Sequence, residues 1–167
     1  MQSHTSKKIA YMALFVALAL IFSYVEALIP IDFGIPGIKL GIANVVSVIS
    51  LSLFGFFETL IIVILRVVIS GFLFGNLYSI IYSLAGGIFS VLLMVALKKT
   101  KKFSVYGISM GGGVTHNLGQ LIVATLTINQ LRLAFYGPIL IISGLIMGWL
   151  IGVASDQVLK RVETYVR

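Results

Sequence analysis

The chain is dominated by apolar runs of about 20 residues, which is the length that an α-helix needs to cross a bilayer. Hydrophobic residues make up 59% of the sequence and charged residues only 10%, whereas a soluble domain carries about 25% charged residues. So few charges cannot cover a surface that faces water. The sequence therefore predicts an all-α membrane protein.

Six apolar runs are predicted to be transmembrane helices of a single integral membrane domain that covers residues 1–167. They lie at about residues 9–29, 39–56, 59–75, 77–97, 104–128 and 134–155. Turn-forming pairs mark two of the boundaries, with Gly75-Asn76 before the fourth run and Gly137-Pro138 near the start of the sixth. The second and third runs are separated only by Phe57 and Glu58. The expected architecture is a six-helix bundle.

The basic residues indicate how this bundle lies in the membrane. If the N-terminus is cytoplasmic, nine of the 12 Lys and Arg residues fall on the cytoplasmic side: Lys7, Lys8, Lys98, Lys99, Lys101, Lys102, Lys160, Arg161 and Arg167. Only Lys39 and Arg132 then face outward. The positive-inside rule therefore predicts a multi-pass protein of the cell membrane with both termini in the cytoplasm. Because the basic residues mark helix ends and do not line one face, we expect no nucleic-acid partner.

Arg66 stands alone within residues 60–74, which are otherwise almost wholly apolar. An arginine at the centre of a bilayer costs about 2.5–3.5 kcal/mol on insertion scales, so it normally faces the bundle interior or a wet cavity and has a partner. One interpretation is a structural ion pair that joins two helices. The other is a polar binding site inside a transport protein.

The predicted orientation places the polar side chains in the middle and outer half of the bundle. The candidate substrate-binding residues are Lys39, Asn44, Arg66, Tyr82, His116, Asn117 and Gln120. His116 and Gln120 are four residues apart and share a helix face, and Asn117 flanks them. The alternative for these three is an interhelical network with about 0.6–2 kcal/mol per hydrogen bond. For Lys39, the alternative is snorkelling to the outer headgroups.

We expect no metal site and no cofactor. The sequence has no cysteine, and no carboxylate accompanies His116 in its polar run. A stripe of small residues, Ala10, Ala13 and Ala17, lies in the cytoplasmic half of the first helix and permits close helix approach. It is predicted either to pack inside this bundle or to receive a helix of another protein.

Four segments in order carry a family resemblance: Lys39–Asn44 (KLGIAN), Leu53–Glu58 (LFGFFE), Tyr82–Gly87 (YSLAGG) and His116–Gln120 (HNLGQ). They resemble the Gx transporter family, whose members are often labelled heptaprenyl diphosphate synthase component I. That family is similar to the substrate-binding S-components of energy-coupling factor (ECF) vitamin transporters. The resemblance implies six helices, a small-molecule ligand near the outer face and a lid between the first two helices, here residues 30–38. It also implies that the alanine stripe docks on a transmembrane coupling subunit driven by ATPase subunits.

The resemblance leaves the ligand open, with flavins (riboflavin or FMN) and isoprenoid or quinone-related compounds as the two candidate classes. The synthase label conflicts with the residues, because prenyl diphosphate synthesis needs clustered aspartates to hold magnesium and this chain has only Asp32 and Asp156. We therefore expect a binding subunit and not an enzyme. The second hypothesis is a non-catalytic membrane anchor or accessory subunit of a prenyl diphosphate synthase or of a flavin-dependent electron-transfer complex. A third is a proton-linked carrier that uses Glu58, Arg66 and His116.

Overall fold

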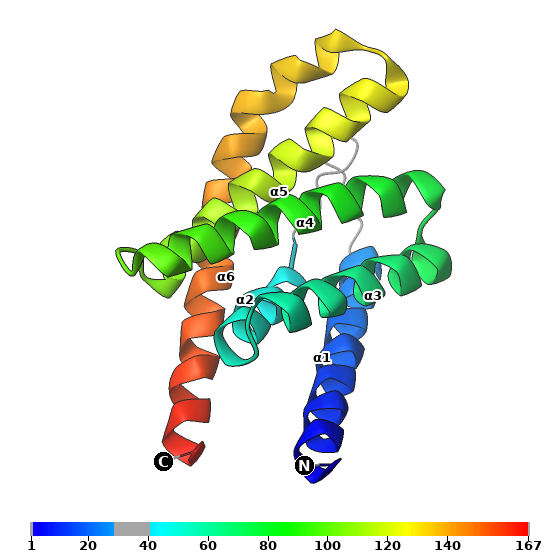
Figure 1. Cartoon of the computed structure of the whole chain (residues 1–167). Helices are drawn as coiled ribbons and strands as arrows, with labels where there is room; N and C mark the ends of the chain where they lie inside the picture. Colours follow the sequence, from blue (N-terminus) through cyan, green and yellow to red (C-terminus); the bar gives the residue numbers. More distant parts are fainter. Residues whose placement is uncertain (1, 29–40, 167) are drawn as a thin grey trace.

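The computed structural model describes residues 2–28 and 41–166, and every regular element in these two ranges is a helix. The elements are α1 (Gln2–Leu28), α2 (Asn44–Leu53), α3 (Phe56–Phe74), α4 (Leu77–Thr100), α5 (Val105–Ile128), the 3-10 helix η1 (Leu131–Tyr136) and α6 (Gly137–Val166) (Figure 1). The prediction of an all-α chain is confirmed for this part of the protein.

Four stretches among the described residues are long and apolar enough to cross a membrane: Ser6–Leu28, Phe56–Phe74, Leu77–Thr100 and Leu131–Val162. Helix α2 is apolar but has only 10 residues. Helix α5 is long enough, with 24 residues, but the polar run at 115–120 lowers its mean hydropathy. Length and composition therefore support four of the six predicted spans, and the other two stay predictions.

Helix α2 is shorter than predicted, and the break that follows it lies elsewhere. It begins at Asn44, after Gly41 with φ of 72°, and it ends at Leu53, before Gly55 with φ of 103°. Both φ values lie in the left-handed region that glycine adopts readily and other residues do not. The predicted helix over 39–56 and the predicted break at Phe57-Glu58 are therefore wrong for the described residues. The chain turns at Gly55, and Glu58 lies in the first turn of α3, where the helix dipole favours a negative charge.

The other boundaries follow from local capping. Helix α4 begins with a capping box in which the Asn76 side chain accepts from the Ser79 N–H at 2.9 Å and the Ser79 hydroxyl accepts from the Asn76 N–H at 3.0 Å. It ends at Thr100, and the next residue, Lys101, is left-handed with φ of 57°. Helix α6 begins at Gly137 with Pro138 in its first turn, where a missing N–H costs nothing. It continues to Val166, beyond the predicted end at 155.

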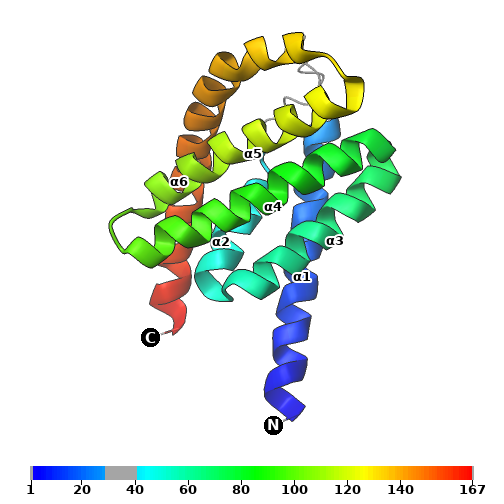
Figure 2. The ribbon, with the colours of Figure 1, turned by 45° about the horizontal axis from the view of Figure 1, so that its top comes forward.

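Neighbouring helices pack as a bundle in which α3 lies beside α4, α4 beside α5, and α5 beside α6 (Figures 1 and 2). Glycines make the α5–α6 approach close: a Cβ on Gly148 would lie 2.6 Å from the Met110 Cα, and one on Gly144 would lie 2.8 Å from the Val114 Cα. The start of α1 and the end of α6 lie on the same side of the bundle in both views. A chain that crosses a membrane an even number of times has both termini on the same side.

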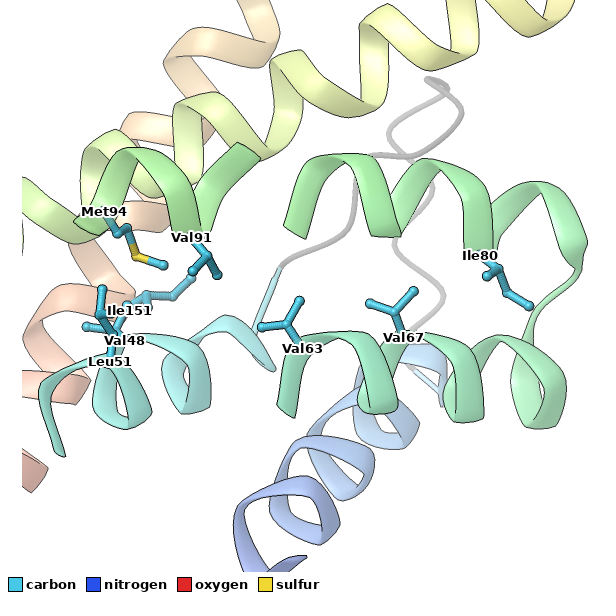
Figure 3. Close-up of a cluster of buried hydrophobic side chains, with 8 residues drawn as sticks. All are labelled: Val48, Leu51, Val63, Val67, Ile80, Val91, Met94 and Ile151. Carbon is cyan, nitrogen blue, oxygen red and sulfur yellow. The ribbon is translucent and has the colours of Figure 1, made fainter. Parts of the chain in front are cut away.

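The main core cluster joins four helices (Figure 3). It consists of Val48 and Leu51 on α2, Val63 and Val67 on α3, Ile80, Val91 and Met94 on α4, and Ile151 on α6. A second cluster attaches α1 through Ala19, Val46 and Ile62, with the Phe15 ring edge-on to Phe54 at a centroid distance of 5.1 Å. Many large apolar side chains outside these clusters are exposed, as expected for helices surrounded by lipid.

Candidate functional site

Arg66 is the charged centre of a polar cluster between α1, α2 and α3. Its side chain is only 9% exposed, and its Nη2 donates to Asn44 Oδ1 at 3.4 Å. At that distance the hydrogen bond is weak. A buried guanidinium therefore needs more than this amide oxygen to offset its lost hydration.

Glu26 places a carboxylate near this cluster. The half-buried Glu26 side chain accepts a hydrogen bond from the Gly41 N–H. This contact joins the C-terminal part of α1 to the turn before α2, and the Asn44 contact joins the start of α2 to the middle of α3. Glu26 was absent from the sequence-based candidates. Its place near the end of the first predicted helix follows from the sequence, but its position relative to Arg66 does not.

Gly41 gives this cluster its backbone donor. With φ of 72°, its backbone lies where a side chain is strained, and an added Cβ would approach Asn44 Nδ2 to 3.1 Å. Only glycine is readily accommodated there. The Gly41 N–H therefore bonds to Glu26, while the Asn44 side chain, three residues further on, bonds to Arg66. Lys39, the remaining basic candidate of this region, lies outside the described residues.

The polar run of α5 is buried between α4 and α6. His116 and Asn117 are each 9% exposed and Gln120 is 8% exposed. His116 and Gln120 lie against α4, since a Cβ on Gly86 would meet the His116 carbonyl oxygen at 2.7 Å and Gln120 Cγ at 2.8 Å. Asn117 points to α6 instead, and its Nδ2 donates to the Leu140 carbonyl at 2.9 Å. The three residues therefore contact two different neighbouring helices.

Helix α4 lies between the two polar groups. Gly86 contacts the α5 group, and a Cβ on the adjacent Gly87 would meet Val63 Cγ1 of α3 at 2.7 Å, one turn from Arg66. Tyr82 lies one turn before Gly86 on the same face of α4 and is half-buried. The described candidates thus form two groups, one on each side of the Gly86-Gly87 pair. Asn44 and Arg66 form one group, and the polar residues of α5 form the other.

The cytoplasmic end of the bundle, by the predicted orientation, carries a different set of charges. Lys8 forms an ion pair with Glu58, and Lys98 Nζ donates to the Leu51 carbonyl at 2.7 Å, where it caps the C-terminus of α2. Tyr106 donates to Asp156 at 2.7 Å, and Lys160 pairs with the same carboxylate. Glu58 is eight positions from Arg66 along α3, which corresponds to about 12 Å. Glu58 therefore lies apart from Arg66, with which the carrier hypothesis groups it.

The alanine stripe is exposed. Ala10, Ala13 and Ala17 all face away from the described bundle, and α1 packs instead through a separate face. That packed face consists of Met12, Phe15, Val16, Ala19 and Phe22. Of the two interpretations of the stripe, packing inside the bundle does not agree with this arrangement.

One family comparison accounts for most of the chain. The family model described as heptaprenyl diphosphate synthase component I matches residues 15–158, which include α2 to α5 completely, about half of α1 and most of α6. Comparisons with curated proteins and with solved structures gave no match. Because the family match covers far more than half of the sequence, this chain belongs to the heptaprenyl diphosphate synthase component I family.

Proposed function

We propose that the protein is the membrane-embedded substrate-binding subunit of an ECF-like transporter for a small organic molecule. The observation that carries this proposal is the burial of Arg66, His116, Asn117 and Gln120 within a bundle of membrane-type helices. Polar and ionisable side chains are expensive at such depth, and they characteristically mark ligand or ion pathways. Lys39, Asn44 and Tyr82 complete the proposed ligand contacts.

The proposed partners are a transmembrane coupling subunit and ATPase subunits, which supply the energy for transport. The exposed stripe of Ala10, Ala13 and Ala17 is the proposed docking surface for the coupling subunit, because small side chains let another helix approach closely. The proposed location is the cell membrane with both termini in the cytoplasm. In this orientation the alanine stripe lies in the inner half of the membrane.

We further propose that the chain itself catalyses no reaction. A prenyl diphosphate synthase holds magnesium with clustered aspartates, and the two aspartates of this chain, Asp32 and Asp156, are predicted at opposite membrane faces. We therefore interpret the family description as naming a membrane component of the synthase and not its catalytic chain.

The ligand classes are flavins and prenyl compounds, and one experiment tests both. The protein is purified in native-lipid nanodiscs, its bound small molecules are identified by mass spectrometry, and its melting temperature is measured with riboflavin, FMN, farnesol and farnesyl diphosphate. We expect one class to co-purify and to raise the melting temperature. A His116→Ala variant should lose most of that shift, whereas Gln130→Ala, in the exposed α5–η1 turn, should keep it. No bound compound and no shift with any of the four would contradict the proposal.

The family description favours a second candidate, a non-catalytic subunit that anchors a prenyl diphosphate synthase or an electron-transfer complex. Affinity purification from the native cell distinguishes the two. A stable complex with a synthase, without ATPase subunits and without loss of uptake on gene deletion, would favour the anchor. Recovery of ATPases with a coupling subunit would favour the transporter.

A further inference from the structure

The turn between α4 and α5 carries four lysines within five residues. Lys98 is engaged inside the protein, since its Nζ donates to the Leu51 carbonyl. Lys99, Lys101 and Lys102 are exposed and form no ion pair with any residue that the structure describes. The turn lies at one edge of the bundle in both views (Figures 1 and 2). It therefore presents three positive charges that the described part of the chain does not balance.

Hydrogen bonds hold this turn in one shape. The Thr100 hydroxyl donates to the Leu97 carbonyl at 2.7 Å and accepts from the Lys102 N–H at 3.3 Å. Lys101 has a left-handed backbone, and its N–H donates to the Lys98 carbonyl at 3.2 Å. The three free ammonium groups thus extend from a fixed backbone, which lowers the entropic cost of placing them around one anion.

One exposed face of α4 leads directly to this turn. Phe89, Leu92 and Ala96 are all exposed, and their spacing of three and then four residues puts them on one side of the helix. Lys99 is exposed three residues further along the same side. An acyl chain that lies along the three apolar residues therefore brings its headgroup to Lys99. A lipid fits this combination, because an acidic surface of a water-soluble partner would contact the lysines alone.

We propose that the α4–α5 turn binds the headgroup of an anionic lipid. Lys99, Lys101 and Lys102 contact the phosphate, and the acyl chains lie along the exposed face of α4. Lysines at a membrane surface attract anionic headgroups, and salt screens the attraction. By the predicted orientation this lipid belongs to the inner leaflet. The site lies at the opposite end of α4 from Tyr82, so the inference does not depend on the proposed transport function.

The test compares phosphatidylglycerol with phosphatidylcholine of the same acyl chains. Each lipid is titrated onto the full-length protein in detergent, and the bound lipids are counted by native mass spectrometry. We expect phosphatidylglycerol to bind about tenfold more tightly at low salt, and this preference should shrink at high salt. Replacing Lys99, Lys101 and Lys102 together by glutamine should abolish the preference. Replacing the same three lysines by arginine should keep it, because the charges remain.

The matched control removes the same number of positive charges at three other exposed positions, as the triple variant Lys7→Gln, Arg132→Gln and Arg161→Gln. This variant should keep the preference for phosphatidylglycerol. An equal loss in both triple glutamine variants would mean that net charge alone attracts the lipid, and it would overturn the local site. Equal binding of the two lipids to the wild-type protein would overturn it as well.

A partner protein at the same turn is the other outcome of this test. The lysine-to-glutamine variant could bind both lipids as the wild type does and yet no longer co-purify with a partner subunit from the native cell. The turn would then be a protein interface, and the lipid proposal would be wrong. If the triple variant does not fold, Lys99→Gln alone takes its place and should lower the preference several-fold. An unchanged preference in that single variant would contradict the proposal.

Discussion

At the scale of single residues, the most informative feature is Arg66, a charged side chain buried in an apolar helix. Arg66 was predictable from the sequence because it interrupts an apolar run. Its surroundings were not, because the position of Glu26 relative to Arg66 depends on how α1 is rotated about its axis and where it meets α2. Neither quantity follows from helical periodicity in a chain whose helices are apolar on all sides. The weak Asn44 contact and the Gly41 N–H likewise depend on the turn before α2.

Replacing Arg66 by alanine should destabilise the protein far more than replacing Arg132. Arg66→Ala removes a side chain that is only 9% exposed together with its hydrogen bond to Asn44, and the void that it leaves should cost about 2–5 kcal/mol. Arg132 is exposed in η1, so Arg132→Ala should change the stability by less than about 0.5 kcal/mol. Thermal unfolding in nanodiscs gives the comparison. Equal melting temperatures for the two variants would show that Arg66 has no structural partner.

The three polar residues of α5 should separate into two kinds of effect. Asn117→Ala loses the hydrogen bond to the Leu140 carbonyl and should lower the stability of the α5–α6 contact by about 0.6–2 kcal/mol. His116→Ala and Gln120→Ala should act mainly on ligand affinity, since neither residue makes the bond to α6 and both lie against Gly86 of α4, among the proposed ligand contacts. Melting temperature and ligand titration are measured on the same samples. Identical profiles for all three variants would argue against this division.

At the scale of helices, the α5–α6 contact is a backbone-to-backbone approach that glycine makes possible. Gly148→Ala should destabilise the bundle by about 1–3 kcal/mol, because its Cβ would lie 2.6 Å from the Met110 Cα, and backbone cannot move aside cheaply. Gly137→Ala on the same helix is the control, since its Cβ would meet only Leu121 Cδ2 at 3.8 Å. In detergent, Gly148→Ala should therefore unfold at a lower temperature than the wild type, and Gly137→Ala should not.

The exposed alanine stripe gives a second prediction at this scale. Ala13→Trp or Ala17→Trp should leave the melting temperature and ligand binding of the isolated protein unchanged but abolish recovery of the coupling and ATPase subunits. The reason is that an indole holds a partner helix away. Leu92→Trp, on the exposed face of α4, controls for a bulky residue in lipid and should keep the partners. A lowered melting temperature in the α1 variants would place the stripe inside the fold.

The helices themselves were largely predictable, and their ends less so. The Gly75-Asn76 break and the lysine-rich end of α4 were both predictable from the sequence, because capping residues and charges mark them. The limits of α2 were not, since 39–56 reads as one continuous apolar run and nothing in it shows that Gly41 and Gly55 have positive φ. The division of the polar residues into two groups on either side of α4 was also not predictable. It depends on which helices pack against Gly86 and Gly87, and the sequence does not show this.

At the scale of the whole molecule, the orientation can be tested directly, because the chain has no cysteine. A single cysteine replaces Phe103, exposed between α4 and α5, or Gln130, exposed between α5 and η1. In intact cells a membrane-impermeant maleimide should label Gln130→Cys and leave Phe103→Cys unlabelled until the cells are opened. The reverse pattern would mean that both termini lie outside.

The short second helix has an electrical consequence. Its 10 residues rise about 15 Å, which is half of a hydrocarbon core of roughly 30 Å. If α2 runs along the membrane normal with its Leu53 end at the inner surface, as the predicted orientation has it, Asn44 and the neighbouring Arg66 lie near the midplane. An anion that travels from outside to Arg66 then moves through about half of the membrane potential. For an inside-negative potential of 100 mV, this opposes binding by about 1.2 kcal/mol per charge, half of the roughly 2.3 kcal/mol for a full crossing. Capture of an anionic ligand at Arg66 would therefore be electrogenic and would tighten as the cell depolarises, whereas capture of a neutral ligand would not respond to the membrane potential.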